Sequence, residues 1–257
     1  MSIEAARPEG DEPLRIASLG VGQIGGTLAS RFAAAGHEVR LANSRAPSTV
    51  KLFAESIGAQ ARHGAEAVLD ADVVVVSVPF NRIAELRSVV SRAPADAVLV
   101  DTTNYYPHRD GELGSFGPED TESEWVANVL GRPVVKAWNS ILAGSLQTAA
   151  RPSGAADRMA LPVSGDDPEA VGLVCGLVDV SGFDPVVAGP LAQSWRQQPG
   201  APAYTTDLAT TELVEALARA ERHTLAERRG EMVRAIRHLR GWGTHAQRLA
   251  IARRVFL

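Results

Sequence analysis

The first half of the chain alternates between short apolar runs and longer segments whose apolar residues recur at helical spacing. The run Val73–Val76 has four β-branched residues and no polar alternation, which is typical of a strand covered on both faces. Comparable runs predict strands at residues 14–19, 38–42, 97–100 and 134–138, and helical spacing predicts helices at 23–35, 47–57 and 81–91. This alternation predicts a parallel, doubly wound sheet of the α/β class.

The pattern changes after residue 150. Polar stretches rich in glycine and proline predict loops at 107–120 and 151–157, and residues 158–163, 168–180 and 185–187 predict a strand, a helix and a short strand. From Asp207 onward the spacing is almost entirely helical. We therefore predict a disordered tail at 1–13, an α/β domain at 14–150, and a smaller α/β to helical C-terminal domain at 151–257.

Composition and charge narrow the range of partners. Hydrophobic residues make up 45% of the chain and charged residues 22%, which is ordinary for a soluble globular protein. The formal net charge of -4 gives no general attraction to nucleic acid or anionic membranes. No signal-peptide pattern opens the chain, and no apolar run approaches the ~20 residues that a membrane helix needs. We expect a cytoplasmic protein that binds neither nucleic acid nor membrane.

The chain lacks the residue patterns of several common catalytic sites. The single cysteine, Cys175, lies in an apolar run, and the six histidines are scattered without metal-ligand spacing, so no metal site is predicted. No nucleophile elbow is present, and no catalytic residue is predicted. Ten arginines follow residue 218. We interpret them as the solvated face of packing helices, with a binding face for an anionic partner as the alternative.

A glycine-rich turn carries the strongest chemical signal. Residues 20–25 match G-x-G-x-x-G, with a predicted strand before the motif and a predicted helix after it. Gly20 allows the tight turn, Gly22 lets the backbone approach a pyrophosphate, and Gly25 lets the helix pack close to the strand. The free N–H groups at the helix N-terminus favour phosphate binding. Residues 14–150 therefore resemble a Rossmann dinucleotide-binding domain.

The end of the second strand indicates which dinucleotide binds. Enzymes that use NAD usually place an acid there, against the ribose 2′-hydroxyl. This chain has Asn43, Ser44 and Arg45 instead. A hydroxyl and a guanidinium suit a 2′-phosphate, which a carboxylate would repel. The pattern predicts NADP(H) as the cofactor.

Polar residues also follow later strands of the predicted sheet. Ligands of open α/β sheets bind at the carboxyl ends of parallel strands. We therefore expect the ribose and nicotinamide to lie against three further loops: Ser77, Val78 and Pro79 after the fourth strand, residues 101–104 after the fifth, and Asn139, Ser140 and Ile141 after the sixth. The crevice outside residues 77–79 and 139–143 is the predicted acceptor site, where Asn139 and Ser140 would donate hydrogen bonds to a ring and Ile141 and Leu142 would form an apolar floor. Alternatively, Asn139 caps the turn and Ile141 and Leu142 belong to the core.

Taken together, the motifs resemble the coenzyme F420-dependent NADP reductases and the related NADPH-binding domain of the STEAP metalloreductases. The resembling segments are residues 16–25, 36–39, 43–45, 71–79, 135–141, 162–167 and 182–191. Their order and spacing are more specific than any one of them. The chain departs from the family in a longer, more polar segment at 194–204 and in the extra residues after Leu225.

The resemblance implies a Rossmann domain with a smaller C-terminal domain, a homodimer, and direct hydride transfer with NADPH. It assigns NADP binding to Gly20, Gly22, Gln23, Ile24, Ser44 and Arg45, and part of a second ring site to residues 139–143. It implies F420 or a flavin as the second substrate.

Two alternatives to this function stay open. One is an NADPH-dependent reductase of a small imine or carbonyl compound, which would need a proton donor. The candidates for that donor are Tyr105, Tyr106, His108 and Tyr204. The other is a non-catalytic NADPH sensor that signals through its helical C-terminal region.

Overall fold

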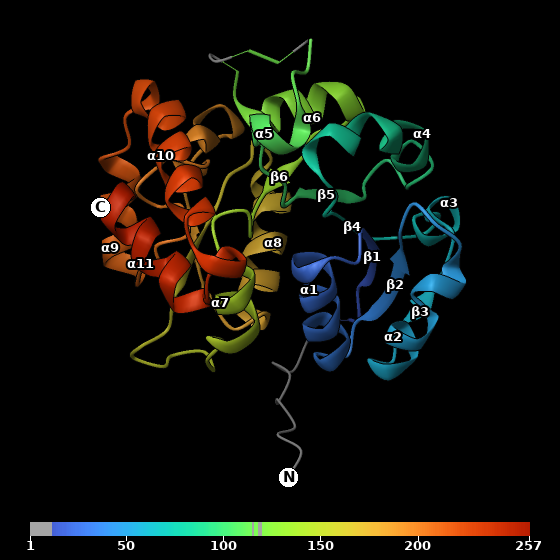
Figure 1. Cartoon of the computed structure of the whole chain (residues 1–257). Coiled ribbons are helices and arrows are strands. Elements are labelled where there is room, and N and C mark those ends of the chain that lie inside the picture. The colour runs from blue at the N-terminus through green and yellow to red at the C-terminus, as the bar shows by residue number, and fades with distance from the viewer. Residues whose placement is uncertain (1–11, 115, 118–119) are drawn as a thin grey trace.

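The computed structural model describes residues 12–114, 116–117 and 120–257, so residues 1–11 of the predicted tail lie outside the described part. Six parallel strands form the main sheet in the order β3-β2-β1-β4-β5-β6 (Figure 1). The strands are β1 (Arg15–Leu19), β2 (Glu38–Ala42), β3 (Gln60–Ala61), β4 (Val73–Val76), β5 (Val98–Asp101) and β6 (Val135–Lys136). Strand order reverses at β1 and β4, as in the predicted doubly wound fold.

The main sheet is covered on both faces, as the valine run of β4 predicts. Val73 and Val75 belong to one hydrophobic cluster, while Val74 and Val76 belong to another. The first cluster contains buried residues of α1 (Gln23–Ala34), α2 (Lys51–Ser56), α7 (Ala143–Thr148) and α8 (Pro168–Val180). The second contains those of α3 (Gly64–Ala67), the 3-10 helix η2 (Phe80–Leu86), α4 (Arg87–Val90) and α6 (Glu122–Leu130).

The C-terminal region begins with a small sheet and ends in helices. Strands β7 (Ala160–Val163) and β8 (Asp184–Val187) pair in parallel around α8, and a bridge between Lys136 and Ser164 links this unit to β6. The later helices, drawn in orange to red in Figure 1, are η3 (Leu191–Gln197), α9 (Thr210–Ala218), η4 (Arg222–Thr224), α10 (Leu225–Arg237), η5 (Arg240–Trp242) and α11 (His245–Phe256). Helices α10 and α11 share a cluster that contains Met232, Ile251 and Phe256.

Several predicted elements need correction. The helix expected at 47–57 is a 3-10 turn, η1 (Pro47–Thr49), followed by α2, and the one expected at 81–91 is η2 followed by α4. The strand expected at 134–138 is only β6, because the backbone turns at Trp138, whose φ is 55°. The loop expected at 107–120 opens with α5 (Pro107–Asp110), where the Asp110 carboxylate accepts a hydrogen bond from the Tyr106 N–H at 2.8 Å.

The sequence analysis also predicted no element at β3, α3, α6, α7 or η3. In the described part of the chain, no helix is long and apolar enough to cross a membrane. The domain boundary at residue 150 stays a prediction, since α7 and α8 on either side of it pack in the same cluster on the sheet.

Candidate functional site

The glycine-rich turn connects β1 to α1, and two of its glycines are required by the fold. Gly20 has a φ of +108°, and a Cβ there would lie 2.1 Å from the Ser77 carbonyl oxygen. A Cβ at Gly25 would lie 2.2 Å from the carbonyl oxygen of Gly20. Both positions therefore exclude larger residues, because the turn, β4 and α1 approach one another closely.

Gly22 is free of this constraint. It is the N-cap of α1, with an ordinary φ of −82° and no side chain to cap the helix. A Cβ at this position would meet nothing within 4 Å. The free N–H groups at the start of α1 therefore face open space, which is the arrangement that anion-binding helix N-termini present.

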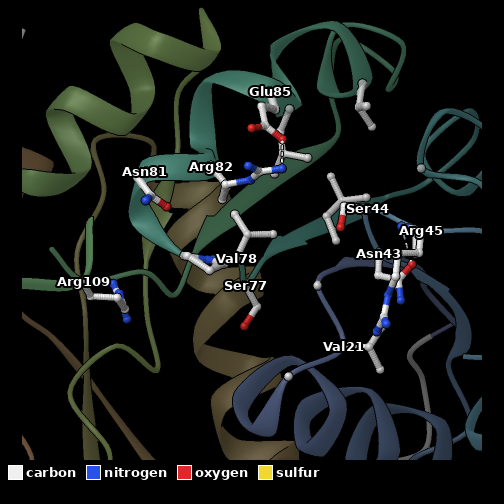
Figure 2. A pocket seen from close by; sticks show the side chains of 18 residues that line it. Val21, Asn43, Ser44, Arg45, Ser77, Val78, Asn81, Arg82, Glu85 and Arg109 are labelled. Carbon is white, nitrogen blue, oxygen red and sulfur yellow. Dashed lines mark hydrogen bonds and ion pairs between the residues drawn. The ribbon is translucent and has the colours of Figure 1, made fainter. Parts of the chain in front are cut away.

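The first cleft, of about 800 Å³, opens above this turn. It is lined by residues from the ends of β1, β2 and β4 and from η2, among them Gly20, Gly22, Asn43, Ser44, Arg45, Ser77, Val78 and Pro79. Figure 2 shows Asn43, Ser44 and Arg45 on one side of this cleft, with Arg82 and Glu85 on another. Eight of the thirteen residues predicted to bind the cofactor thus line one cavity.

The predicted phosphate-binding residues are held by a local turn. The Asn43 side chain accepts a hydrogen bond from the Arg45 N–H at 2.9 Å and donates one to Thr49 Oγ1 at 3.0 Å. The Arg45 guanidinium is exposed and makes no hydrogen bond or ion pair with any described residue. Arg82, in contrast, pairs with Glu85 at 2.8 Å (Figure 2). Arg45 therefore brings an uncompensated positive charge to the cleft.

A second cleft, of about 560 Å³, continues from the first. The two share Gly22, Arg109 and residues 77–79. The second cleft then extends over Gln23 and Ile24, over residues 102–104 after β5, and over residues from the C-terminal region. It has the size of an ordinary small-molecule site.

The loop after β6 only partly fulfils its predicted role. Asn139 and Ile141 line the second cleft, but Ser140 lines neither cleft and is buried. The Asn139 amide donates to the Gln197 carbonyl at 2.7 Å and to Asn104 Oδ1 at 3.1 Å. These bonds tie the loop to Asn104 and Gln197 rather than capping the following turn, and the contact of Asn139 with an acceptor ring stays a prediction.

Two of the four candidate proton donors meet in the second cleft. The hydroxyl groups of Tyr106 and Tyr204 lie 2.7 Å apart. Burial raises the pKa of Tyr106 to about 12 and raises that of Tyr204 well above its usual value. Both phenols therefore keep their protons at neutral pH. Tyr105 instead donates to the Gly111 carbonyl at 2.7 Å, and His108 is exposed and lines neither cleft.

A buried ionic cluster lies beneath the strand ends, and the sequence analysis did not anticipate it. The Lys136 ammonium is 3.4 Å from Asp101 and 3.7 Å from Glu122, and it donates to the Thr103 carbonyl at 3.1 Å. Asp101 also accepts bonds from the backbone and side chain of Thr103 at 2.8 and 2.7 Å. The cluster thus fixes the Thr103 loop, which lines the second cleft. Burial raises the pKa of Glu122 to about 7.

Three further residues of the second cleft escaped the sequence analysis: Arg109, Thr205 and Arg248. Arg109 lies in a stretch predicted as loop, and Arg248 is one of many arginines near the C-terminus. Periodicity gave no signal that would single them out. Among the described residues, no three histidine, cysteine, aspartate or glutamate side chains come together in a way that could hold a metal ion.

Comparison with known proteins finds one family match and several similar solved structures. Residues 15–105 match the family described as NADP oxidoreductase, coenzyme F420-dependent. The crystal structure of the hypothetical protein SMa0349 from Sinorhizobium meliloti is similar with a TM-score of 0.65 and 32% sequence identity. That similarity covers 77% of this chain and 96% of the other.

Two more proteins are similar, one with lower sequence identity and the other over a shorter part of the chain. A protein of Arthrobacter sp. FB24, to which F420-dependent NADP reductase activity has been ascribed, has a TM-score of 0.55 and 24% identity over 70% of this chain and 87% of its own. It shares the fold. The protein YjhV of Escherichia coli (strain K12) is 50% identical over 56 residues, which span 22% of this chain and 41% of that protein.

Proposed function

The chain belongs to the family of coenzyme F420-dependent NADP oxidoreductases, whose pattern its residues 15–105 match, and on this premise we propose that it transfers a hydride between NADP(H) and a small-molecule acceptor. The observation that carries the proposal is the pair of joined clefts. One has the free α1 N-terminus and an unpaired arginine, and the other has room for a second molecule beside it.

The residues present fit NADP(H). The N–H groups at Gly22, Gln23 and Ile24 would hold the pyrophosphate, because the space in front of Gly22 is open. Ser44 and Arg45 would hold the 2′-phosphate, because the Arg45 guanidinium has no protein partner in the described chain. When bound, NADPH supplies the hydride. The loops at 77–79 and 139–143 exclude water and align the two molecules, which is the main requirement of such a transfer.

The acceptor in this proposal is the deazaflavin ring of F420, or a flavin ring. A direct test follows NADPH oxidation by the purified protein with F420, FMN and riboflavin, in the absence of oxygen. Oxidation of NADPH coupled to reduction of one of these rings supports the proposal. Tight NADPH binding without oxidation by any acceptor would contradict it and favour the sensor alternative.

The Tyr106–Tyr204 pair favours a second candidate, reduction of a small carbonyl or imine compound. Such a product takes up a proton, which a buried phenol can donate. Tyr106→Phe should lower kcat for a carbonyl substrate by about 100-fold or more and should leave reduction of a flavin ring within a few-fold. Equal effects on the two substrate classes would remove this candidate.

We also propose a homodimer, as the family resemblance implies. Two exposed apolar side chains on elements that pack together support it: Val187 of β8 is 64% exposed and Val214 of α9 is 51% exposed. Light scattering coupled to gel filtration gives the mass directly. A mass equal to one chain at micromolar concentration would refute the dimer.

A further inference from the structure

One residue of the arginine-rich C-terminal region points into the second cleft. Arg248 lies in α11, far in sequence from residues 15–105, and it lines the second cleft together with Tyr204 and Thr205. Ala252, one turn further along α11, is fully buried in the cluster that contains Tyr204. Residues four apart share a helix face, so this packing directs Arg248 toward the cleft. Arg254 lies elsewhere on α11, is exposed, and lines neither cleft.

The Arg248 guanidinium has no protein partner in the described part of the chain. Its Nε is buried and makes no hydrogen bond, and no described carboxylate lies within ion-pair distance of it. The other arginine of this cleft, Arg109, is compensated by Asp110 at 2.8 Å. The lining of the second cleft contains two arginines and no carboxylate. A half-buried, unpaired charge destabilises a protein unless a ligand brings the opposite charge.

Thr205 adds a second unpartnered group at the same place. The residue is only 2% exposed, and its hydroxyl oxygen is buried without a hydrogen-bond partner in the described chain. Its φ of 56° is costly for a β-branched residue, and a bond from its N–H to the Ser140 carbonyl at 2.7 Å helps to hold it. Trp138, with a φ of 55°, lines the same cleft. Such strain is typical of ligand-binding sites.

We propose that Arg248 and Thr205 form an anion-binding site for a carboxylate or phosphate group carried by the acceptor. The acceptor is then an acidic small molecule, held at its acidic end by α11 while its reacting end lies beside residues 77–79. This inference rests on the proposed function and names the substrate class of the same site. The cofactor is the other possible source of an anion, but in the proposed function its phosphates are bound by the α1 N-terminus and Arg45.

The test compares ligands that share a ring and differ in the acidic group. FMN and riboflavin form one pair, and F420 and its deazariboflavin core, which lacks phosphate and glutamate, form the other. Dissociation constants are measured by ligand fluorescence with protein saturated with NADP⁺. The wild type should bind the acidic member of at least one pair about tenfold to a hundredfold more tightly. Arg248→Met should abolish that ratio, Arg248→Lys should keep part of it, and the matched control Arg254→Met should keep all of it.

Three results would overturn the inference. They are equal binding of the two members in both pairs, a ratio that survives Arg248→Met in a folded variant, and no binding of either acidic ligand at millimolar concentration. An Arg248→Met variant that binds NADPH weakly and the acidic ligand normally would assign the anion to the cofactor, and would also overturn it. Because the readout is binding, tight and Arg248-dependent binding without NADPH oxidation would contradict the proposed function and leave the inference standing.

Discussion

Replacing Arg45 with alanine should change cofactor preference without changing stability. The Arg45 guanidinium makes no contact that the fold would lose, so the effect falls on binding. A charged hydrogen bond to phosphate contributes about 1.5–3 kcal/mol. Arg45 is exposed, and solvent screening therefore places this contact at about 1–2 kcal/mol. That corresponds to a loss of about 5- to 30-fold in NADPH affinity, with NADH affinity almost unchanged.

Titration calorimetry with NADPH and NADH measures both affinities on the same protein. Lys51→Ala is the matched control, because Lys51 is also exposed and positively charged but does not line the cleft. The preference of the wild type for NADPH should also shrink as salt rises, since an exposed contact is screened. Equal affinities of the wild type for NADPH and NADH would refute the reasoning, and so would an equal loss for Lys51→Ala.

Two further predictions concern the turn and the buried cluster. Gly22→Val should leave the free energy of unfolding within about 1 kcal/mol of wild type but abolish NADPH binding, whereas Gly25→Ala should destabilise the fold, because its Cβ would meet the Gly20 carbonyl. Urea unfolding measures the stability of each variant, and NADPH titration measures its affinity. Wild-type NADPH affinity in Gly22→Val would contradict the placement of the pyrophosphate at this turn. Glu122 has a folded pKa of about 7, above its unfolded value, so it binds more protons when folded and its contribution to stability is present at low pH and lost as pH rises toward 7. The free energy of unfolding of Glu122→Gln, relative to that of wild type, should therefore rise by on the order of 3 kcal/mol from pH 5 to pH 8, as measured by urea unfolding at the two pH values. A difference in free energy of unfolding that is the same at both pH values would show that the pKa of the Glu122 carboxyl is not raised.

Most residues that the sequence assigned to the cofactor line the first cleft together, because their positions follow from local patterns. The glycine spacing at 20–25 and the polar end of β2 each follow a strand directly, and the parallel sheet brings such strand ends together. The valines of β4 indicated a strand between two layers, and the two clusters have that arrangement. Residues such as Arg45 could therefore be chosen by counting from the first glycine.

The acceptor half could not be predicted in this way. Tyr106 and Tyr204 are 98 positions apart, and Arg248 reaches the same cleft only because α11 packs against Tyr204. Such pairings depend on tertiary packing, which hydrophobic periodicity does not report. The early end of β6 is similar: the apolar pattern extends to Trp138, but the strand ends at Lys136 because the backbone turns at Trp138, whose φ is 55°. Helix α6 was missed because a polar stretch precedes it and obscures its start at Glu122.

The division of the two clefts along the chain has a consequence for biosynthesis. All residues that line the first cleft precede residue 110, whereas the second requires Thr205 and Arg248. At a ribosomal rate of about 5–20 residues per second, Arg248 is added on the order of ten seconds after Arg109. A nascent chain therefore holds every residue of the first cleft well before the C-terminal residues of the second cleft are made. Under the proposed function, NADP(H) could bind and stabilise the emerging sheet during that interval.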